Sequence, residues 1–285
     1  MADTQNEIYA QAYGENIMQL AQQKYSKLIN TVFLKPNVKG KVFFQDQIGE
    51  WAMSTKGGRN VQTPNNDPNL ARRMGTMLDY HDNRMLDRGD ELKCISDPRS
   101  AYTIAAARSL GRKIDDVIIE AAISTSQKSG ETGSTTAPTT TTILASASNI
   151  TLTSILAWKK ALDDADVEME DRYCIINNTC LQSLLDVTEI GSADYNSVKA
   201  LVKGDMGTFL GFTWIPTTRL ASSSIGSTLI GLVYQKYALT LAMATQPMVR
   251  TDERADLSYS WQIYYELNCG AARLEENRIR KIIEG

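Results

Sequence analysis

The sequence predicts a mixed α+β fold, and three segments carry that prediction. Residues 97–125 place apolar side chains every three or four positions, as a long amphipathic helix does. Between residues 151 and 235, helix-like and strand-like patterns follow one another in short runs. In 257–265, apolar and polar residues alternate, which is typical of a half-buried strand.

Composition sets broad limits on function. The chain has 285 residues, 42% of them hydrophobic and 22% charged, which is ordinary for a soluble globular protein. Its 30 basic and 33 acidic residues give a net charge of −3, so it lacks the basic bias of a dedicated nucleic-acid binder. No apolar run reaches the roughly 20 residues that span a bilayer. The first residues do not resemble a signal peptide. We therefore expect a cytosol-like compartment and no membrane partner.

The N-terminal residues 5–30 predict a helix with a thin apolar stripe. Such a helix is marginal alone, so we interpret it as an arm that needs a partner surface. The stripe consists of Ile8, Ala12, Ile17, Leu20, Ala21 and Leu28.

The next region, 36–95, is rich in glycine and proline and predicts a long projecting hairpin. Residues 42–54 favour one strand, 83–95 favour the returning strand, and 56–69 form a polar, turn-rich stretch between them. From Lys41 to Lys93 the chain carries eight basic and eight acidic residues. Loops of this length are uncommon unless they have a function.

The long helix at 97–125 has clear start signals. Asp97 suits the N-cap and Pro98 the first helical position. At 1.5 Å per residue its length is about 40 Å. Gly111 in its middle costs about 1 kcal/mol relative to alanine, so we expect a close packing contact there.

The remaining residues predict a compact second region after a Ser/Thr/Gly-rich boundary at 126–150 with some extended structure. The expected elements are a helix capped by Thr153 and ending near Ala165, a strand over 171–176, a helix entered through Asn178, strands over 211–220 (interrupted at Pro216), 227–234 and 257–265, a turn at Gly270, and a strand-rich segment over 272–285.

The search for catalytic or ligand-binding patterns finds none. The phosphate-binding loop, the dinucleotide fingerprint and the nucleophile elbow are all absent. His81, between Asp79 and Asp82, is the single histidine, and we interpret it as a surface residue because a metal site needs ligands from several elements. We therefore predict no catalytic residues, no cofactor and no metal.

Other chemistry-bearing residues also favour structural roles. Adjacent acidic residues in a helix point about 100° apart, so the two acidic pairs are interpreted as solvated faces. The four cysteines are expected to be reduced. Basic residues that suit phosphate or an acidic partner are interpreted first as salt bridges, and the strand aromatics as core. The acidic pairs are Asp115–Asp116 and Asp163–Asp164, and the cysteines are Cys94, Cys174, Cys180 and Cys269. The basic residues are Arg72, Arg73, Arg278, Arg280 and Lys281, and the strand aromatics are Tyr259, Trp261 and Tyr265.

The order of segments resembles the major capsid proteins of tailed bacteriophages, in the fold named after phage Hong Kong 97 (the HK-97 type), and most closely the podophage-like members. The matching motifs are Met85-Leu86-Asp87 and Cys94 to Tyr102 at the entry to the spine helix, Leu110 to Ala122 within it, Gly130-Glu131-Thr132-Gly133 after it, Asp171-Arg172-Tyr173 with Asn177-Asn178, and Leu210 to Trp214.

This resemblance implies a domain order: an N-terminal arm at 1–40, an extended E-loop hairpin at 41–96, a peripheral domain with the spine helix at 97–150, an axial domain at 151–226, and a return to the peripheral domain at 227–285. It also implies a shell subunit that is not an enzyme. Such subunits form pentamers and hexamers that close into an icosahedral shell around double-stranded DNA, which lies near the shell without specific binding. The resemblance also implies maturation of a procapsid and a final location in the virion.

Partners follow from the same resemblance. The arm is too short for an internal scaffold, so a separate scaffolding protein and a portal protein are expected, with assembly in the host bacterial cytoplasm. We hypothesise that five arginines of the hairpin make contacts between subunits: Arg59, Arg72, Arg73, Arg84 and Arg88.

Two alternative functions remain, an encapsulin-like cage and an unrecognised α/β enzyme.

Overall fold

The protein folds into two compact units, which the chain enters in alternation. The first contains Met1–Ser26, Asp79–Arg112 and Gln246–Leu267, and the second Lys27–Leu78, Lys113–Thr245 and Asn268–Gly285. The computed structural model describes residues 21–65, 67–87, 98–124, 127–130, 132–136, 139–145, 151–185, 208–224, 228–244 and 247–284.

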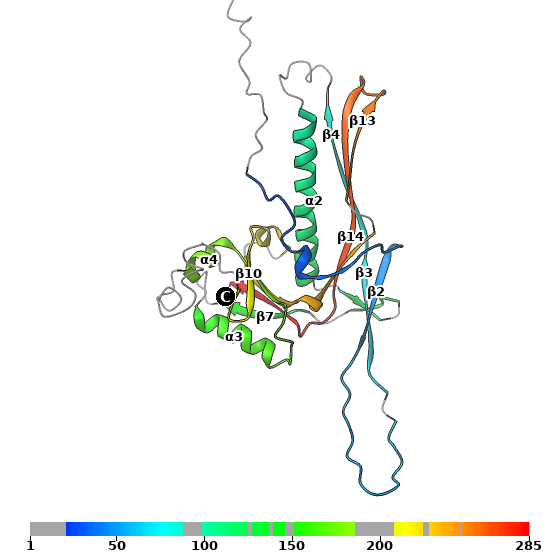
Figure 1. The fold of residues 1–285 in the computed structure, drawn as a ribbon, viewed down its shortest axis with the longest axis vertical. Helices are drawn as coiled ribbons and strands as arrows, with labels where there is room; N and C mark the ends of the chain where they lie inside the picture. The colour runs from blue at the N-terminus through cyan, green and yellow to red at the C-terminus, as the bar shows by residue number, and fades with distance from the viewer. Residues whose placement is uncertain are drawn as a thin grey trace, which may run out of the picture. The chain divides into compact units, whose positions relative to one another are not determined.

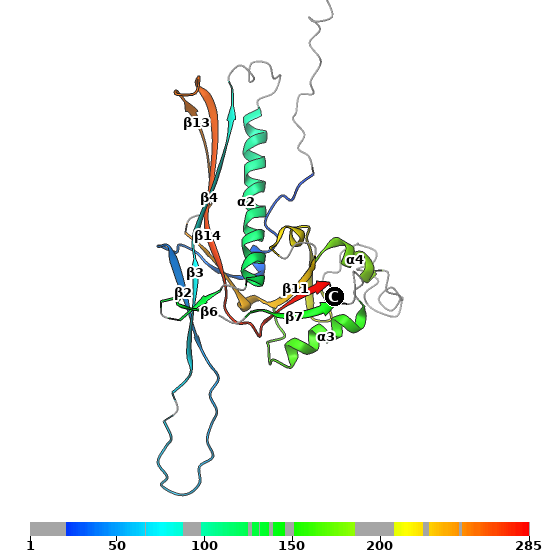
Figure 2. The same ribbon diagram turned by 180° about the vertical axis from the view of Figure 1, so that it is seen from behind.

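The first unit is built from long strands beside a helix. Helix α2 (Pro98–Ile123) confirms the predicted long helix, although Asp97 lies outside the described residues. Strand β4 (Leu78–Leu86) pairs with β14 (Ser260–Arg273), which pairs in turn with β13 (Met248–Arg254). These strands run alongside the N-terminal half of α2 (Figures 1 and 2).

The N-terminal prediction needs correction where the structure describes it. Residues 21–28 are bends and irregular chain, followed by a single 3₁₀ turn, η2 (Ile29–Thr31). Residues 5–20 of the predicted helix lie outside the described residues. The irregular chain lies against α2 at Gly111, where an added Cβ would come within 2.9 Å of the backbone nitrogen of Ser26. This confirms the expected close contact at Gly111.

The second unit contains a six-stranded sheet in the order β7-β15-β11-β8-β10-β9. Helices α3 (Leu152–Asp163) and α4 (Asn178–Leu185) share its apolar core through Trp158, Leu184 and Trp214. Both helices flank the sheet (Figure 1). The strands are β7 (Thr141–Ala145), β8 (Arg172–Ile176), β9 (Thr208–Phe209), β10 (Phe212–Pro216), β11 (Leu229–Gln235) and β15 (Ile279–Glu284).

The strands predicted over 171–176 and 227–234 are confirmed, and α4 begins at Asn178 as predicted, but the cap of α3 shifts. Thr151, not Thr153, caps α3, because its side chain accepts the backbone N–H of Ser154. Asn177 caps α4, because its Oδ1 accepts the N–H of Cys180 at 2.7 Å. In each case the capping side chain must reach an N–H group three residues further on. The strand predicted over 211–220 with an interruption at Pro216 instead ends at Pro216, and the 3₁₀ turn η3 (Arg219–Ser222) follows it.

A further part of the second unit brings β1, near the N-terminus, together with strands from the C-terminal third of the chain. Strand β1 (Phe33–Lys35) runs parallel to β12 (Leu239–Met243), which follows the short turn η5 (Lys236–Ala238) and pairs with residues 269–273 of β14. The turn predicted at Gly270 is therefore wrong, because Gly270 lies inside the strand. An added Cβ there would lie 2.2 Å from the carbonyl oxygen of Thr76, so glycine serves a close approach of two backbones.

The projecting hairpin exists, but its return strand is not where the sequence placed it. Strand β2 (Val42–Ile48) pairs with β3 (Leu70–Thr76), and residues 83–86 of the expected return strand belong to β4 instead. β3 also pairs with β5 (Lys128–Ser129), and β5 with β6 (Thr135–Thr136). These short strands are the extended structure expected within 126–150.

Sheet pairing also cuts across the expected segments. The six-stranded sheet takes β7 from 97–150, β8 and β10 from 151–226, and β11 and β15 from 227–285. Parallel and antiparallel partners thus come from distant parts of the chain, which local sequence patterns do not reveal.

Candidate assembly surface

The hairpin β2–β3 exposes an unusual number of large apolar side chains for a soluble domain. Trp51 is 64% exposed and Met53 98% exposed in the connection between the strands. Ile48, Val61 and Leu70 are also exposed. Single exposed apolar residues are normal, but several on one element indicate a contact surface. We call these five residues the apolar set of the hairpin.

The hairpin is ordered by its base, where one aromatic ring is buried. Phe43 pairs across the strands with Gly75, and a Cβ at Gly75 would lie 2.2 Å from the Phe43 ring. The absent side chain leaves room for the ring, which packs with Met77, Ala242 and Ala272. The base is therefore part of the core of the second unit, whereas the apolar set is not.

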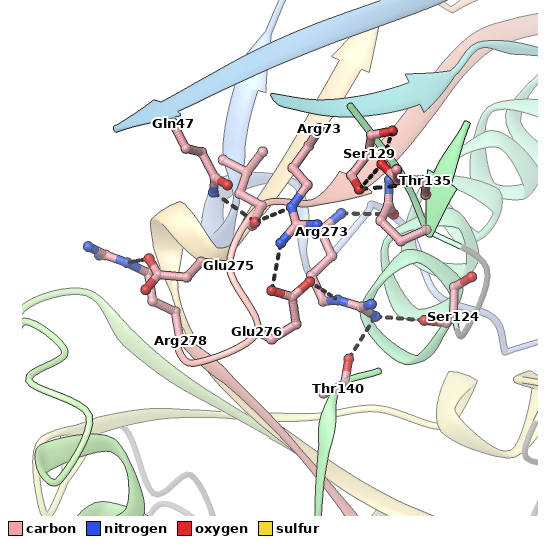
Figure 3. A network of polar contacts seen from close by, with 12 residues as sticks. Gln47, Arg73, Ser124, Ser129, Thr135, Thr140, Arg273, Glu275, Glu276 and Arg278 are labelled. Carbon is pink, nitrogen blue, oxygen red and sulfur yellow. Dashed lines mark hydrogen bonds and ion pairs between the residues drawn. The ribbon is translucent and has the colours of Figure 1, made fainter. Parts of the chain in front are cut away.

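Polar contacts fasten both strands of the hairpin at the same end (Figure 3). Gln47 on β2 and Arg73 on β3 both donate to the carbonyl oxygen of Leu274, at 2.7 and 2.9 Å. A second bond joins Nη2 of Arg73 to Oε2 of Glu276 at 2.8 Å. These groups lie in the connection between β14 and β15, so this connection sets the direction in which the hairpin leaves the unit.

Arg273 binds the same carboxylate, that of Glu276, from a buried position (Figure 3). Its side chain is 0% exposed and lies 3.5 Å from the second carboxylate oxygen of Glu276. Nη1 donates to the carbonyl oxygen of Ser124 and to Oγ1 of Thr140, both at 2.7 Å. Burial lowers the pKa of the Arg273 guanidinium, while Glu276 raises it. Because Ser124 follows the last residue of α2, the buried cation also lies at the negative end of the helix dipole.

Glu276 therefore bridges two guanidinium groups that are themselves nearly buried. Buried charges are tolerated only when they are paired and hydrogen-bonded. Gln127 connects the same junction to the hairpin, since it donates to the carbonyl oxygen of Met74 and accepts from the N–H of Arg273. We call Arg73, Gln127, Arg273 and Glu276 the polar junction.

The structure places the five hairpin arginines in different surroundings. Arg59 is exposed in the loop between β2 and β3. Arg72 forms an exposed pair with Asp46, which lowers the pKa of that carboxyl. Arg73 belongs to the polar junction. Arg84 lies on β4, 3.4 Å from Asp82, so the prediction that it belongs to the hairpin is wrong. Arg88 lies outside the described residues.

Other predicted residues largely take the structural roles expected of them. Arg278 pairs with Glu168 and Glu275, which confirms the salt-bridge interpretation. Arg280 differs, because its guanidinium donates to backbone carbonyl groups, including that of Ala161. His81 is exposed on β4, 6.4 Å from the ring of Tyr264. Within the described part of the chain, no group of three potential metal ligands comes together.

The aromatic and acidic predictions are mixed. Tyr265 is buried, as expected for core, but Tyr259 is exposed in the turn before β14. Asp115 is fully buried, so the interpretation of the pair Asp115–Asp116 as a solvated face is wrong for its first member. Its partners are backbone groups far away in sequence, which no local pattern shows. Three cysteines, Cys174, Cys180 and Cys269, are buried free thiols.

The polar junction was not predicted from the sequence. Its members come from four segments, and Arg73 meets Glu276 across 203 positions. A partial signal exists in Arg273, a basic residue following the apolar run Cys269 to Ala272. Basic residues in such a context are buried only when partners are provided by other segments.

Comparison with known proteins identifies the family. The family described as phage capsid protein matches residues 6–283, which is nearly the whole chain. The chain belongs to this family. No curated protein matches the chain.

Solved capsid structures share the fold of this capsid protein. The capsid structure of the cyanophage P-SCSP1u matches with a TM-score of 0.77 and 17% identity, over 98% of this chain and 94% of that one. A Mycobacterium phage Che8 structure has a TM-score of 0.76 and 16% identity, with 97% of each chain covered. The capsid of a native GTA particle has a TM-score of 0.75 and 11% identity, over 100% and 98%. These matches show the HK-97-type capsid fold.

Family membership makes this capsid protein a structural component of the virion that assembles with copies of itself. It also implies a structural rather than a catalytic role. No helix among the described residues is both long enough and apolar enough to span a membrane.

Proposed function

We propose that this chain is the major capsid protein of a tailed phage, which self-assembles into the icosahedral head shell around the double-stranded DNA genome. The observation that carries the proposal is the family match over residues 6–283. The exposed apolar set of the hairpin supports it, because a shell subunit needs surfaces that only neighbouring copies cover.

The domain order follows the family resemblance with adjusted limits. We assign β2, β3 and the connection between them to the E-loop, α2 to the spine helix, and the six-stranded sheet with α3 and α4 to the axial domain. Strands β11 and β15 belong with that sheet because they pair with β8 and β7. The β13–β14 hairpin and β4 belong to the peripheral domain.

The hairpin is proposed to lie across an adjacent subunit and to bury its apolar set there. We propose that Arg59 meets carboxylates of that subunit, and Arg72, Arg84 and Arg88 are kept in the hypothesis, although Arg84 lies on β4 outside the β2–β3 hairpin. Arg73 is assigned to the polar junction instead, because its side chain already binds Glu276. Each exposed ion pair contributes only about 0–1 kcal/mol, but closed symmetry repeats it around every ring.

The remaining partners belong to the same proposal. The subunits form pentamers and hexamers with a separate scaffolding protein and a portal protein, in the host bacterial cytoplasm. The near-neutral charge of the chain suits an inner face that lies near packed DNA without binding it tightly. The protein carries out no catalysis.

Electron microscopy of the protein co-expressed with its scaffolding protein tests this proposal. Closed icosahedral particles tens of nanometres across, about the size expected of repeated pentamers and hexamers, are the expected result. Small cages filled with an enzyme cargo would instead support the encapsulin-like alternative. A stable monomer that catalyses a reaction would support the α/β enzyme and overturn the proposal.

A further inference from the structure

A buried carboxylate on the spine helix holds the backbone of the N-terminal chain. The side chain of Asp115 is 0% exposed. Its Oδ2 accepts the N–H of Lys27 and its Oδ1 accepts the N–H of Leu28, both at 3.2 Å. Two consecutive backbone donors thus bind the two oxygens of one carboxylate.

The chain after this point is integrated into the second unit. Leu28 is fully buried, and Nζ of Lys27 donates to the carbonyl oxygen of Pro216 at 2.7 Å. Oγ1 of Thr31 and the hydroxyl of Tyr234 share a buried hydrogen bond of 2.6 Å. Strand β1 then pairs with β12. From Lys27 onward the chain is therefore part of the folded subunit and not a free arm.

We infer that Asp115 is a positioning residue that fixes where the N-terminal chain joins the subunit. The arm then ends before Gln22, whose Oε1 accepts from Arg112 on α2 at 2.7 Å, rather than at residue 40. The inference rests on the proposed function in one respect, namely that the arm reaches a second copy of this chain. An arm that starts from a fixed place searches less space than one released at an uncertain point. The effective concentration of the arm at its neighbour is accordingly higher.

The chemistry requires a carboxylate at this position. An asparagine offers one acceptor oxygen and places an NH₂ group against the second N–H donor. The neighbouring residue Asp116 is a matched control, since it is also on α2 but binds the guanidinium of Arg219 at 2.8 and 2.6 Å. Asp116→Asn removes the same charge one position away without touching Lys27 or Leu28.

Limited trypsin digestion of the full-length protein tests the anchor directly. Trypsin cleaves after lysine, and the Lys27–Leu28 bond includes an N–H that Asp115 holds. We expect Asp115→Asn to accelerate cleavage after Lys27 by about tenfold or more, because cleavage requires local opening of the anchored chain. Asp116→Asn should leave the rate of cleavage after Lys27 unchanged once any loss of its thermal stability is taken into account. In each variant, the rate of cleavage after Lys24 serves as the internal reference. Equal rates after Lys27 in the wild type and Asp115→Asn would overturn the anchor.

Two truncations then test the boundary and the arm separately. Removal of residues 2–20 should preserve the melting temperature and lower the particle yield, whereas removal of residues 2–32 should also lower the melting temperature because Leu28 and Thr31 are lost. Equal melting temperatures for the two truncations would overturn the assignment of residues 22–32 to the folded subunit. Normal particles from the shorter truncation would overturn the role of the arm while the digestion result stands. If the wild-type protein never forms particles, the proposed function is contradicted. The trypsin digestion still tests independently whether Asp115 holds the chain at Lys27 and Leu28.

Discussion

Strands β11 and β2 have the same length, seven residues, and opposite surroundings within one unit. Every residue of β11 is buried, because β8 and β15 flank it and the sheet is covered. In β2 only Phe43 is buried, and the strand lies at the edge of its sheet. An exposed sheet edge with apolar side chains is normally avoided in soluble proteins.

The difference in burial indicates that apolar residues in the two regions have different roles. Apolar residues around β11 stabilise the subunit, whereas those of the hairpin are available to a second copy. Matched substitutions in the two regions should therefore affect the free energy of unfolding very differently. The predictions below run from the largest expected change in that free energy to the smallest.

Trp158 on α3 should be the most sensitive position. Its side chain is 1% exposed in the core of the six-stranded sheet. Trp158→Ala should lower the free energy of unfolding by about 3–5 kcal/mol, because it removes a large buried ring and leaves a cavity. Urea denaturation of the unassembled subunit measures this. A loss below about 1 kcal/mol would show that the sheet does not carry the stability of the unit.

Glu276 should be the most sensitive polar position. Glu276→Gln leaves Arg73 and Arg273 without their shared carboxylate, and we expect a loss of about 2–3 kcal/mol. Glu275→Gln is the matched control, because Glu275 binds the partly exposed Arg278 and should cost less than about 1 kcal/mol. Thermal melting of both variants provides the comparison. Equal melting temperatures would contradict a role for the polar junction in holding the hairpin.

Tyr265 should have a small, pH-dependent effect in the first unit. Its hydroxyl donates to Asp82 at 2.7 Å, and this bond lowers the pKa of the Asp82 carboxyl. A carboxyl with a lowered folded pKa stabilises the protein above its unfolded pKa, about 3.9, and loses that contribution as the pH falls through the folded value.

Tyr265→Phe should therefore destabilise the protein slightly at pH 7, by less than about 1 kcal/mol because Asp82 is half exposed, and by less still at pH 3. Urea denaturation at both pH values measures the difference, with the exposed Tyr259→Phe as control. A larger loss at pH 3 than at pH 7 has the wrong sign for this hydrogen bond.

Two hairpin substitutions should leave the unfolding free energy unchanged within about 0.5 kcal/mol. These are Trp51→Ala, the exposed counterpart of Trp158, and Arg59→Glu. Both should reduce the yield of closed particles, counted by electron microscopy, because the hairpin is proposed to cover a neighbouring subunit. Normal particle yield from both variants would remove the hairpin tip from the assembly surface.

Local patterns predicted the elements whose side chains carry a clear period. Helix α2 and strands β8 and β11 were found because their apolar residues repeat at helical spacing or form short continuous runs. Strands β3 and β13 were missed, because Leu70–Thr76 and Met248–Arg254 contain many polar residues and depend on neighbouring strands for their structure.

The assembly surface was predicted in part. The length and polarity of 41–95 indicated a projecting hairpin, but the charges suggested that arginines dominate its contacts. The structure adds the exposed Trp51 and Met53 and assigns Arg73 to the subunit itself. Arg73 and Glu276 of the polar junction are 203 positions apart, and Asp115 is 87 positions from Leu28, so no local pattern contains these contacts.

Strand β15 has a consequence for the synthesis of the protein. Ile279–Glu284 lies between β7 and β11, so the sheet has a gap until these residues have been translated. At about 5–20 residues per second, the ribosome releases them well after β8 and β11 have emerged. A shortened chain that lacks β15 would keep two unpaired strand edges. Such chains would be exposed to proteases and chaperones before they could enter a shell. Completion of the sheet therefore favours subunits that contain β15.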